Sequence, residues 1–264
     1  MKYKNLFFWI LAIVVTLTMV VYQRLTGPTH PITGKVIIGG ETIKYKLLRS
    51  YGGPDDAEIS IDDPTGKLEG IFSYKRFKSY DSLTTEPMRH QGGKLIASIP
   101  HQPPAGKVEY RIALTDGTNR LELTEKPVVI RFKGDVPAYI LIPHILLMFL
   151  AMLFSTRTGI ESIAKGPRTL KYSIWTMLFL IGGGLILGPI VQKYAFGAYW
   201  TGWPFGHDLT DNKTALAFIF WAIAVYKLLK NRDKRGWALV AALVTTLVYL
   251  IPHSVLGSEI DYRE

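Results

Sequence analysis

The stretch that decides the fold is "NLFFWILAIVVTLTMVVY", which runs from Asn5 to Tyr22. Its 18 residues carry no charged side chain, and this length is enough for a helix to cross a bilayer. The following residues, "VVYQRLTG", lack the small side chains of a signal-peptide cleavage site. Lys2 and Lys4 precede the run, and basic residues mark the cytoplasmic side of a span. We therefore expect an uncleaved signal anchor over residues 1–26, with its N-terminus in the cytoplasm.

Residues 27–136 have a different character from the first segment. Short runs rich in Val, Ile and Tyr, such as "GKVIIGGETIKYKLL" and "KVEYRIALTDG", are separated by Gly, Pro, Asp and Asn. Several of these runs alternate apolar and polar residues, which is typical of strands with one buried face. The sequence therefore predicts an antiparallel β-sandwich domain of about 110 residues here.

Residues 93–129 carry a resemblance to a known class of domain. Its carriers are "KLIASIP", the turn Pro103–Gly106, "VEYRIALTDG" and "VVIRF". Together they resemble the last strands of fibronectin-III and immunoglobulin-like domains. The resemblance implies an Ig-like sandwich. It does not indicate a function, because proteins of many unrelated functions share that fold.

Four more apolar segments follow Pro137, at about 138–154, 172–192, 214–229 and 236–252. The link after the first and the link after the third, "KLLKNRDKRG", are strongly basic and are expected in the cytoplasm. The predicted architecture is an α+β membrane protein with five spans. The sandwich (27–136) is inserted between the first helix and a four-helix transmembrane domain (137–264). The sandwich, the link 193–213 and the C-terminal tail are then expected outside the cytoplasm, which in a bacterium is the outer side of the inner membrane.

Composition narrows the classes of function. The net charge is +10, yet residues 27–136 hold 16 Lys or Arg against 14 Asp or Glu. Most of the excess lies in short runs beside apolar segments, so it indicates a lipid bilayer rather than nucleic acid as partner. The chain has no cysteine, which excludes disulfides and thiolate catalysis. The sequence also lacks Walker A, GxGxxG, G-x-S-x-G and HExxH patterns, so it nominates no catalytic residue.

Histidines and carboxylates on the expected outer side are candidate ligands. "IPH" occurs twice, and His144 and His253 are candidate axial ligands of a b-type haem. The alternative is that His144 hydrogen-bonds to a neighbouring helix and that His253 marks a helix exit. The chemistry of the outer groups also suits a divalent metal. The candidate metal ligands are His207, Asp208, Asp211, Glu259 and Asp261.

The link "YWTGWPFGHDLTDNKT", Tyr199 to Thr214, combines aromatic and acidic residues. Asp211 also suits the start of a helix, where Thr210 or Asp211 accepts from free backbone N–H groups. The aromatic side chains suit a membrane-interface belt, with a quinone, lipid or glycan pocket as the alternative. These side chains are Tyr199, Trp200, Trp203 and Phe205.

Two further motifs have structural interpretations. Gly184 and Gly188 in "GGGLILG" have the spacing that lets membrane helices approach closely. The basic run "KRFK", Lys75 to Lys78, is expected at a solvated strand edge, with a lipid-headgroup contact as the alternative.

Three functions remain open at this point. The first is a non-enzymatic envelope protein, an accessory subunit that binds a protein partner through its sandwich. The second is a redox or metal-handling membrane protein that uses the outer histidines and carboxylates. The third is a small transporter component, which the scarcity of charge inside the apolar segments disfavours.

Overall fold

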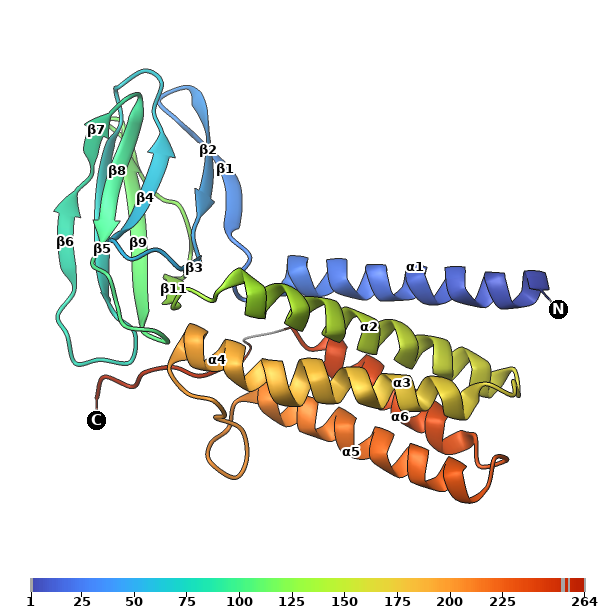
Figure 1. Ribbon diagram of the computed structural model, residues 1–264. Coiled ribbons are helices and arrows are strands. Elements are labelled where there is room, and N and C mark those ends of the chain that lie inside the picture. The colour runs from blue at the N-terminus through green and yellow to red at the C-terminus, as the bar shows by residue number, and fades with distance from the viewer. Residues whose placement is uncertain (1, 253–254, 256, 264) are drawn as a thin grey trace. The chain divides into compact units, whose positions relative to one another are not determined.

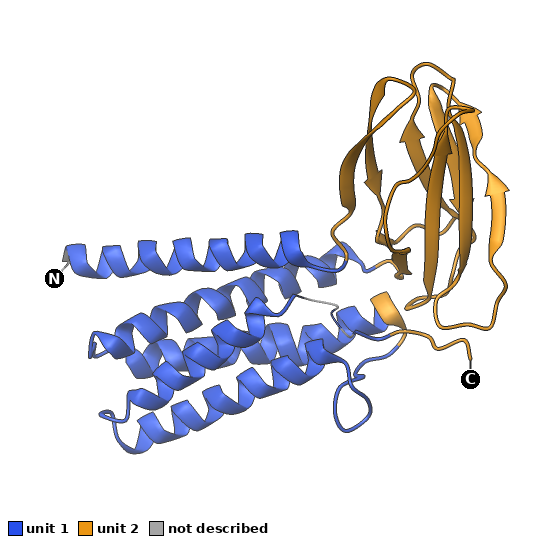
Figure 2. Cartoon of the chain, turned by 180° about the vertical axis from the view of Figure 1, so that it is seen from behind, with its two compact units in different colours: residues 1–28, 136–194, 198–258 blue, residues 29–135, 195–197, 259–264 orange. Residues whose placement is uncertain are grey.

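The computed structural model describes residues 2–252, 255 and 257–263. It divides into two compact units, which Figure 2 colours separately. The helical unit comprises residues 1–28, 136–194 and 198–258. The β unit comprises residues 29–135, 195–197 and 259–264. The chain is therefore an α+β protein with a β-rich region between its first helix and the later apolar helices.

The helical unit contains elongated helices that run side by side (Figure 1). Four helical stretches in the described part of the chain are long and apolar enough to cross a membrane. They are α1 (Lys2–Thr26), α2 (Ala138–Ile163), the continuous run of α3 (Thr169–Phe179), η1 (Leu180–Leu187) and α4 (Gly188–Phe196), and α5 (Leu209–Lys230). The expectation of an integral membrane protein is supported by these four stretches. The fifth expected span is α6 (Gly236–Leu250), which has 15 residues and is shorter than the others.

Apolar and small residues have opposite positions in this unit. Large apolar side chains such as Leu6, Ile145 and Leu247 are more than half exposed, as lipid-facing residues of a membrane helix are. The buried faces include many alanines beside larger residues, and a Cβ added at Gly159 of α2 would meet the Cβ of Ala242 of α6 at 3.0 Å. Small side chains allow helices to pack closely where lipid provides no hydrophobic driving force.

The second helix is longer than its apolar run suggested. The sequence indicated a span over 138–154 and a polar link from Ser155, but α2 continues to Ile163. Arg157 and Glu161 lie in this extension and are nearly inaccessible, with 1% and 5% exposure. Their spacing of four residues places them on one face of the helix, where they form an ion pair. The apolar run 138–154 itself holds no Lys, Arg, Asp or Glu, and the buried ion pair lies in the part of α2 that follows it.

The β unit has three hydrogen-bonded sheets. One is the hairpin of β1 (Ile32–Ile38) and β2 (Glu41–Leu47). The largest has the order β3-β11-β9-β5-β6, with β10 also on β9. Its strands are β3 (Ser50–Tyr51), β5 (Glu69–Arg76), β6 (Thr84–Pro87), β9 (Lys107–Thr115), β10 (Arg120–Glu122) and β11 (Val128–Phe132). The third has the order β4-β8-β7, formed by β4 (Ala57–Asp62), β8 (Lys94–Ile99) and β7 (Arg89–Gln91).

Local sequence explains the first hairpin. The pairing of Ile38 with Glu41 leaves a two-residue turn of Gly39 and Gly40. Both glycines have positive φ, +59° and +79°, as a type I′ turn requires. The "IIGGET" sequence is thus sufficient to place this turn.

Burial alternates along the central strands and produces one apolar core. In β4 the odd-numbered residues from Ala57 to Ile61 are buried, and in β9 the even-numbered residues from Val108 to Ile112 are buried. Their side chains join those of β5, β8 and β11 in a single cluster. Phe72 is completely buried in this cluster, and its ring lies 5.7 Å from that of Tyr110.

Replacement of Phe72 by Ala is expected to destabilise the β unit by about 3–5 kcal/mol, because it removes buried apolar surface and leaves a cavity. Amide hydrogen exchange of residues 57–132 in the full-length protein, in detergent, measures this loss. Ile37→Ala is the matched control, since Ile37 is 76% exposed, and it should change stability by less than about 0.5 kcal/mol. Equal protection in both variants would contradict the core assignment.

Candidate functional site

Asp208 directly precedes α5, and its side chain accepts hydrogen bonds from α5 and from the segment that follows α6. Its Oδ1 accepts from the backbone N–H of Thr210 at 2.7 Å, which makes Asp208 the N-cap residue. Its Oδ2 accepts from both the N–H and the hydroxyl of Ser258, each at 2.8 Å. The expectation that Thr210 or Asp211 supplies the cap was wrong, because the helix begins earlier than its apolar run.

Asp211 organises the link before α5. Its Oδ2 accepts from the backbone N–H groups of Thr201 at 2.7 Å and Gly202 at 2.9 Å, and from the amide of Gln192 at 3.1 Å. Asp211 is 6% exposed, so these donors replace the water that a carboxylate otherwise binds. Gly202 leaves room for this approach, because a Cβ there would lie 2.6 Å from the Cβ of Asp211. The acidic residues of the link therefore have a structural role.

Lys213, in the first turns of α5, is also buried, with 5% exposure. Its ammonium group donates to the carbonyl of Ile251, directly after the end of α6, at 2.8 Å. Together with Asp208, it ties the first turn of α5 to the chain that follows α6. A buried charge needs such a partner, because burial removes the water that otherwise solvates it.

The remaining residues of the link are largely exposed. Tyr199, Trp203 and Phe205 are 59%, 77% and 82% exposed, and His207 is exposed too. Trp200 is half-buried and donates from its indole N–H to the carbonyl of Trp203 at 3.2 Å. Exposure of these rings is compatible with an interfacial belt, which stays a prediction.

His144 contacts the π-helical segment η1. Its Nδ1 is 2.9 Å from the carbonyl oxygen of Gly183, so Nδ1 carries the proton that the carbonyl accepts. This contact matches the structural alternative, a hydrogen bond to a neighbouring helix. His253, the second candidate haem ligand, lies outside the described residues, and the haem hypothesis therefore stays a prediction.

The glycines of η1 permit close packing. A Cβ on Gly184 would lie 2.8 Å from the Cγ2 of Thr214 on α5, and one on Gly183 would lie 2.9 Å from the Cβ of Leu147. Gly188 is less crowded, with its nearest such contact at 3.4 Å. The tightest contacts therefore occur at Gly183 and Gly184.

Glu259 and Asp261 belong to the β unit and have cationic partners there. Glu259 forms ion pairs with Lys78 and Lys107, and Asp261 pairs with Arg263 at 2.6 Å. No group of three or more His, Asp or Glu in the described part of the chain is arranged to hold a metal ion. Each carboxylate of the proposed metal site therefore has a hydrogen-bond or ion-pair partner within the protein. The proposed ligands were His207, Asp208, Asp211, Glu259 and Asp261.

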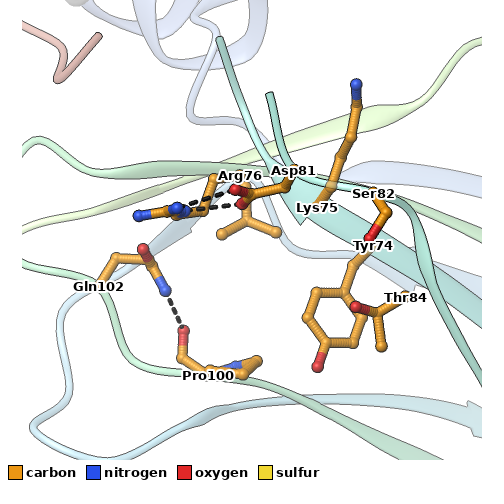
Figure 3. A pocket seen from close by; sticks show the side chains of 9 residues that line it. Tyr74, Lys75, Arg76, Asp81, Ser82, Thr84, Pro100 and Gln102 are labelled. Carbon is orange, nitrogen blue, oxygen red and sulfur yellow. Dashed lines mark hydrogen bonds and ion pairs between the residues drawn. The ribbon is translucent and has the colours of Figure 1, made fainter. Parts of the chain in front are cut away.

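The β unit contains a pocket of about 340 Å³ near the loop between β5 and β6. Figure 3 shows Arg76 and Asp81 paired along one border, with Gln102 and Pro100 across the opening from Tyr74 and Thr84. The Arg76 Nε and Nη2 atoms donate to the two Asp81 oxygens at 2.7 and 2.8 Å. The lining residues are Tyr74, Lys75, Arg76, Asp81, Ser82, Thr84, Pro100, Gln102 and Val108.

The same loop, residues 77–83, presents two exposed apolar side chains. Tyr80 is 84% exposed and Leu83 is 56% exposed. The bidentate pair of Arg76 and Asp81 closes the base of this loop, and the hydrogen bond from Arg76 holds the pKa of the Asp81 carboxyl at about 2. The loop therefore combines an internal ion pair with two exposed apolar side chains, and it adjoins a polar pocket.

Sequence reasoning missed two features of these sites. The first is the set of acidic partners of the "KRFK" run: Lys75 pairs with Glu109 at 3.3 Å, and Arg76 and Lys78 also have acidic partners, although both stay exposed as expected. Only Asp81 lies near enough in sequence to suggest a partner for this run.

The second missed feature is the environment of Arg157 in the helical unit. Its Nη1 lies 2.6 Å from Glu161 Oε2, and its Nη2 donates to Asn5 Oδ1 of α1 at 2.9 Å. The four-residue spacing of Arg157 and Glu161 was the available signal, but the pair was assigned to a link instead. Three aromatic rings also lie 4.8 to 5.4 Å from this guanidinium: Phe8, Trp9 and Tyr172.

Comparison of the chain with models of known protein families, with curated proteins and with solved structures finds no match.

Asp211→Asn is expected to loosen the link before α5, because an amide oxygen accepts the N–H groups of Thr201 and Gly202 more weakly than a carboxylate. Hydrogen bonds to a charged group contribute about 1.5–3 kcal/mol, so exchange of these amides should accelerate by about 10- to 100-fold. Asp233→Asn, at an exposed turn, is the control and should leave their exchange unchanged. Unchanged exchange in Asp211→Asn would refute this role.

The Arg76–Asp81 pair is expected to depend on pH in one direction. Because folding lowers the pKa of Asp81 from 3.8 to about 2, its contribution is fully present above about pH 4 and is lost as the pH falls through 2. A carboxyl NMR titration of Asp81 measures this midpoint. In Arg76→Gln the midpoint should rise towards the ordinary value, whereas the same low midpoint would show that another group holds the carboxylate.

Proposed function

We propose that this chain is an integral membrane protein of the cell envelope that acts as a non-catalytic accessory subunit. In a bacterium it would lie in the inner membrane. Its β unit would be an extracytoplasmic Ig-like sandwich that binds a protein partner. The observation that carries the proposal is the loop 77–83, with its exposed Tyr80 and Leu83 beside the pocket of about 340 Å³.

The chemistry of this loop suits protein recognition. Aromatic and large apolar side chains that project from a surface are the common anchors of protein interfaces, and Tyr is enriched among them. The pair of Arg76 and Asp81 limits the motion of the loop, so less conformational entropy would be lost when a partner binds. The adjoining pocket offers hydroxyl and amide groups for polar contacts around the apolar anchors.

The proposed topology has five spans, with α6 as the fifth. Its 15 residues extend about 22 Å at 1.5 Å per residue, which is less than the apolar core of about 30 Å. Basic residues of the α2–α3 link and of the α5–α6 link support a cytoplasmic position for both. In this topology the β unit, the link before α5 and the C-terminal tail all lie outside.

The Ig-like assignment is supported by the strands that form in residues 93–129 and beyond. β8, β9 and β11 cover the three sequence runs that carry the resemblance. Two multi-stranded sheets contribute to one apolar core, as in a sandwich. By analogy with other domains of this fold class, the β unit would serve as a recognition module.

Replacement of Tyr80 and Leu83 by Ala is expected to reduce partner recovery at least about tenfold, because interface anchors of this kind each contribute more than about 1 kcal/mol. The measurement is the yield of a stoichiometric protein partner that co-purifies with the tagged full-length chain from membranes of its own cells. Ile37→Ala removes an equally exposed apolar side chain elsewhere in the β unit and should leave the yield unchanged. Equal yields from the double variant and the wild type would refute the assignment of loop 77–83.

A further inference from the structure

The tail Glu259–Arg263 contacts the β unit through its backbone. The N–H of Ile260 donates to the carbonyl of Ala105 at 3.3 Å, and the N–H of Tyr262 donates to the carbonyl of Lys78 at 2.9 Å. The Tyr262 bond has the length of an ordinary hydrogen bond and the Ile260 bond is slightly longer, and together they fix the register of this irregular segment. The backbone of the tail is therefore held on the β unit at alternate residues. The contact surface formed by Arg76, Lys78, Gln102 and Lys107 is named the groove.

Two lysines clamp the carboxylate of Glu259. Lys78 pairs with Oε1 and Lys107 with Oε2, so each oxygen has its own cation. Burial alone would raise the pKa of Glu259, but the hydrogen bonds and charges of the two lysines outweigh it and lower the pKa. The site therefore favours an ionised carboxylate at this position of the peptide.

Tyr262 provides the second point of recognition. The guanidinium of Arg76 lies 4.6 Å from the centre of its ring, and its hydroxyl donates to Oε1 of Gln102 at 3.1 Å. Gly106 leaves space for it, because a Cβ there would approach the Tyr262 hydroxyl to 2.7 Å. An aromatic ring with a hydroxyl at its tip satisfies both contacts, whereas Phe satisfies only the first.

The side chains between these two points are not held in the same way. Asp261 pairs with Arg263 at 2.6 Å, within the tail itself. The groove residues Arg76, Lys78, Gln102 and Lys107 therefore read a Glu and a Tyr three positions apart. Arg76 and Gln102 also line the pocket beside loop 77–83.

We propose that this groove is a recognition site for an acidic Glu-x-x-Tyr peptide of a partner protein, and that the chain's own tail occupies it as a displaceable resting ligand. The inference rests on the proposed function, since it requires that the β unit meets a protein partner. The tail is displaceable because its contacts are hydrogen bonds and partly exposed ion pairs, which are individually weak. A partner peptide of the same chemistry replaces each contact without net loss.

A spin label tests whether the tail occupies the groove. The chain has no cysteine, so Arg263→Cys alone takes the label in the full-length protein. In the otherwise unchanged protein the label is expected to give an immobilised spectrum. In Lys78→Glu/Lys107→Glu it should give a mobile spectrum. Addition of Glu259→Lys to that variant should restore the immobilised spectrum. Lys44→Glu/Lys46→Glu, at exposed positions of β2, is the matched control and should stay immobilised. A mobile label in the parent protein would overturn the proposal.

A peptide added in trans tests recognition. The probe is the fluorescein-labelled peptide SEIDYRE, and the full-length variant Glu259→Ala/Tyr262→Ala leaves the groove open. A tethered tail acts at an effective concentration in the millimolar range, so the wild type should bind the probe at least about tenfold more weakly than this variant. A probe in which Ala replaces the first Glu and the Tyr should not bind to the open variant. Addition of Lys78→Glu/Lys107→Glu to the open variant should abolish binding of the unchanged probe.

The two proposals fail in different ways. Absence of probe binding to the open variant, or equal binding to the open variant and the wild type, overturns the groove as a recognition site. The dependence of partner recovery on Tyr80 and Leu83 is measured without the probe. That measurement therefore tests the proposed function independently of the groove. Unchanged hydrogen exchange of β9 in each variant confirms that the β unit is folded in every comparison.

Discussion

Polar groups buried in a membrane helix bundle must find partners within the protein, since lipid offers none. Two buried side chains of the helical unit meet this constraint by bonds between helices. The guanidinium of Arg157 has both Glu161 and Asn5 as partners, so it ties α2 to the beginning of α1. The indole of Trp221, which has no exposed surface, donates to the hydroxyl of Thr245 at 2.8 Å and links α5 to α6. Small residues then allow the helices to approach closely enough for these bonds to form.

Local sequence predicts most of the elements and little of their pairing. The alternation in "KVEYRIALT" reports one buried face, and the glycine pair after Ile38 requires a tight turn, so β9 and the first hairpin were predictable. The apolar runs likewise located the helices. The end of α2 was misplaced because Arg157 is polar in sequence, although its burial is compensated by partners on another helix. Hydrophobicity alone cannot distinguish a solvated charge from a satisfied one.

The candidate sites were less predictable than the fold, because their contacts join residues that are distant in sequence. Glu259 was grouped with other acids as a metal ligand, but its partners Lys78 and Lys107 precede it by 181 and 152 residues. Asp211 has the residue type and position of a helix cap, yet its carboxylate turns back to the preceding link. In both cases the residue type correctly indicated a strong acceptor. The donor that it would meet depends on tertiary structure, which spacing does not report.

The long sequence separation between Glu259 and its lysines has a consequence during biosynthesis. Chains are made at about 5–20 residues per second, so Glu259 emerges roughly 8 to 30 seconds after Lys107. The loop that carries Lys78 and the strand that carries Lys107 have both been synthesised by then, and no strand pairing of the β unit involves the tail. Each newly made chain therefore passes through a period in which the two lysines have no carboxylate to hold.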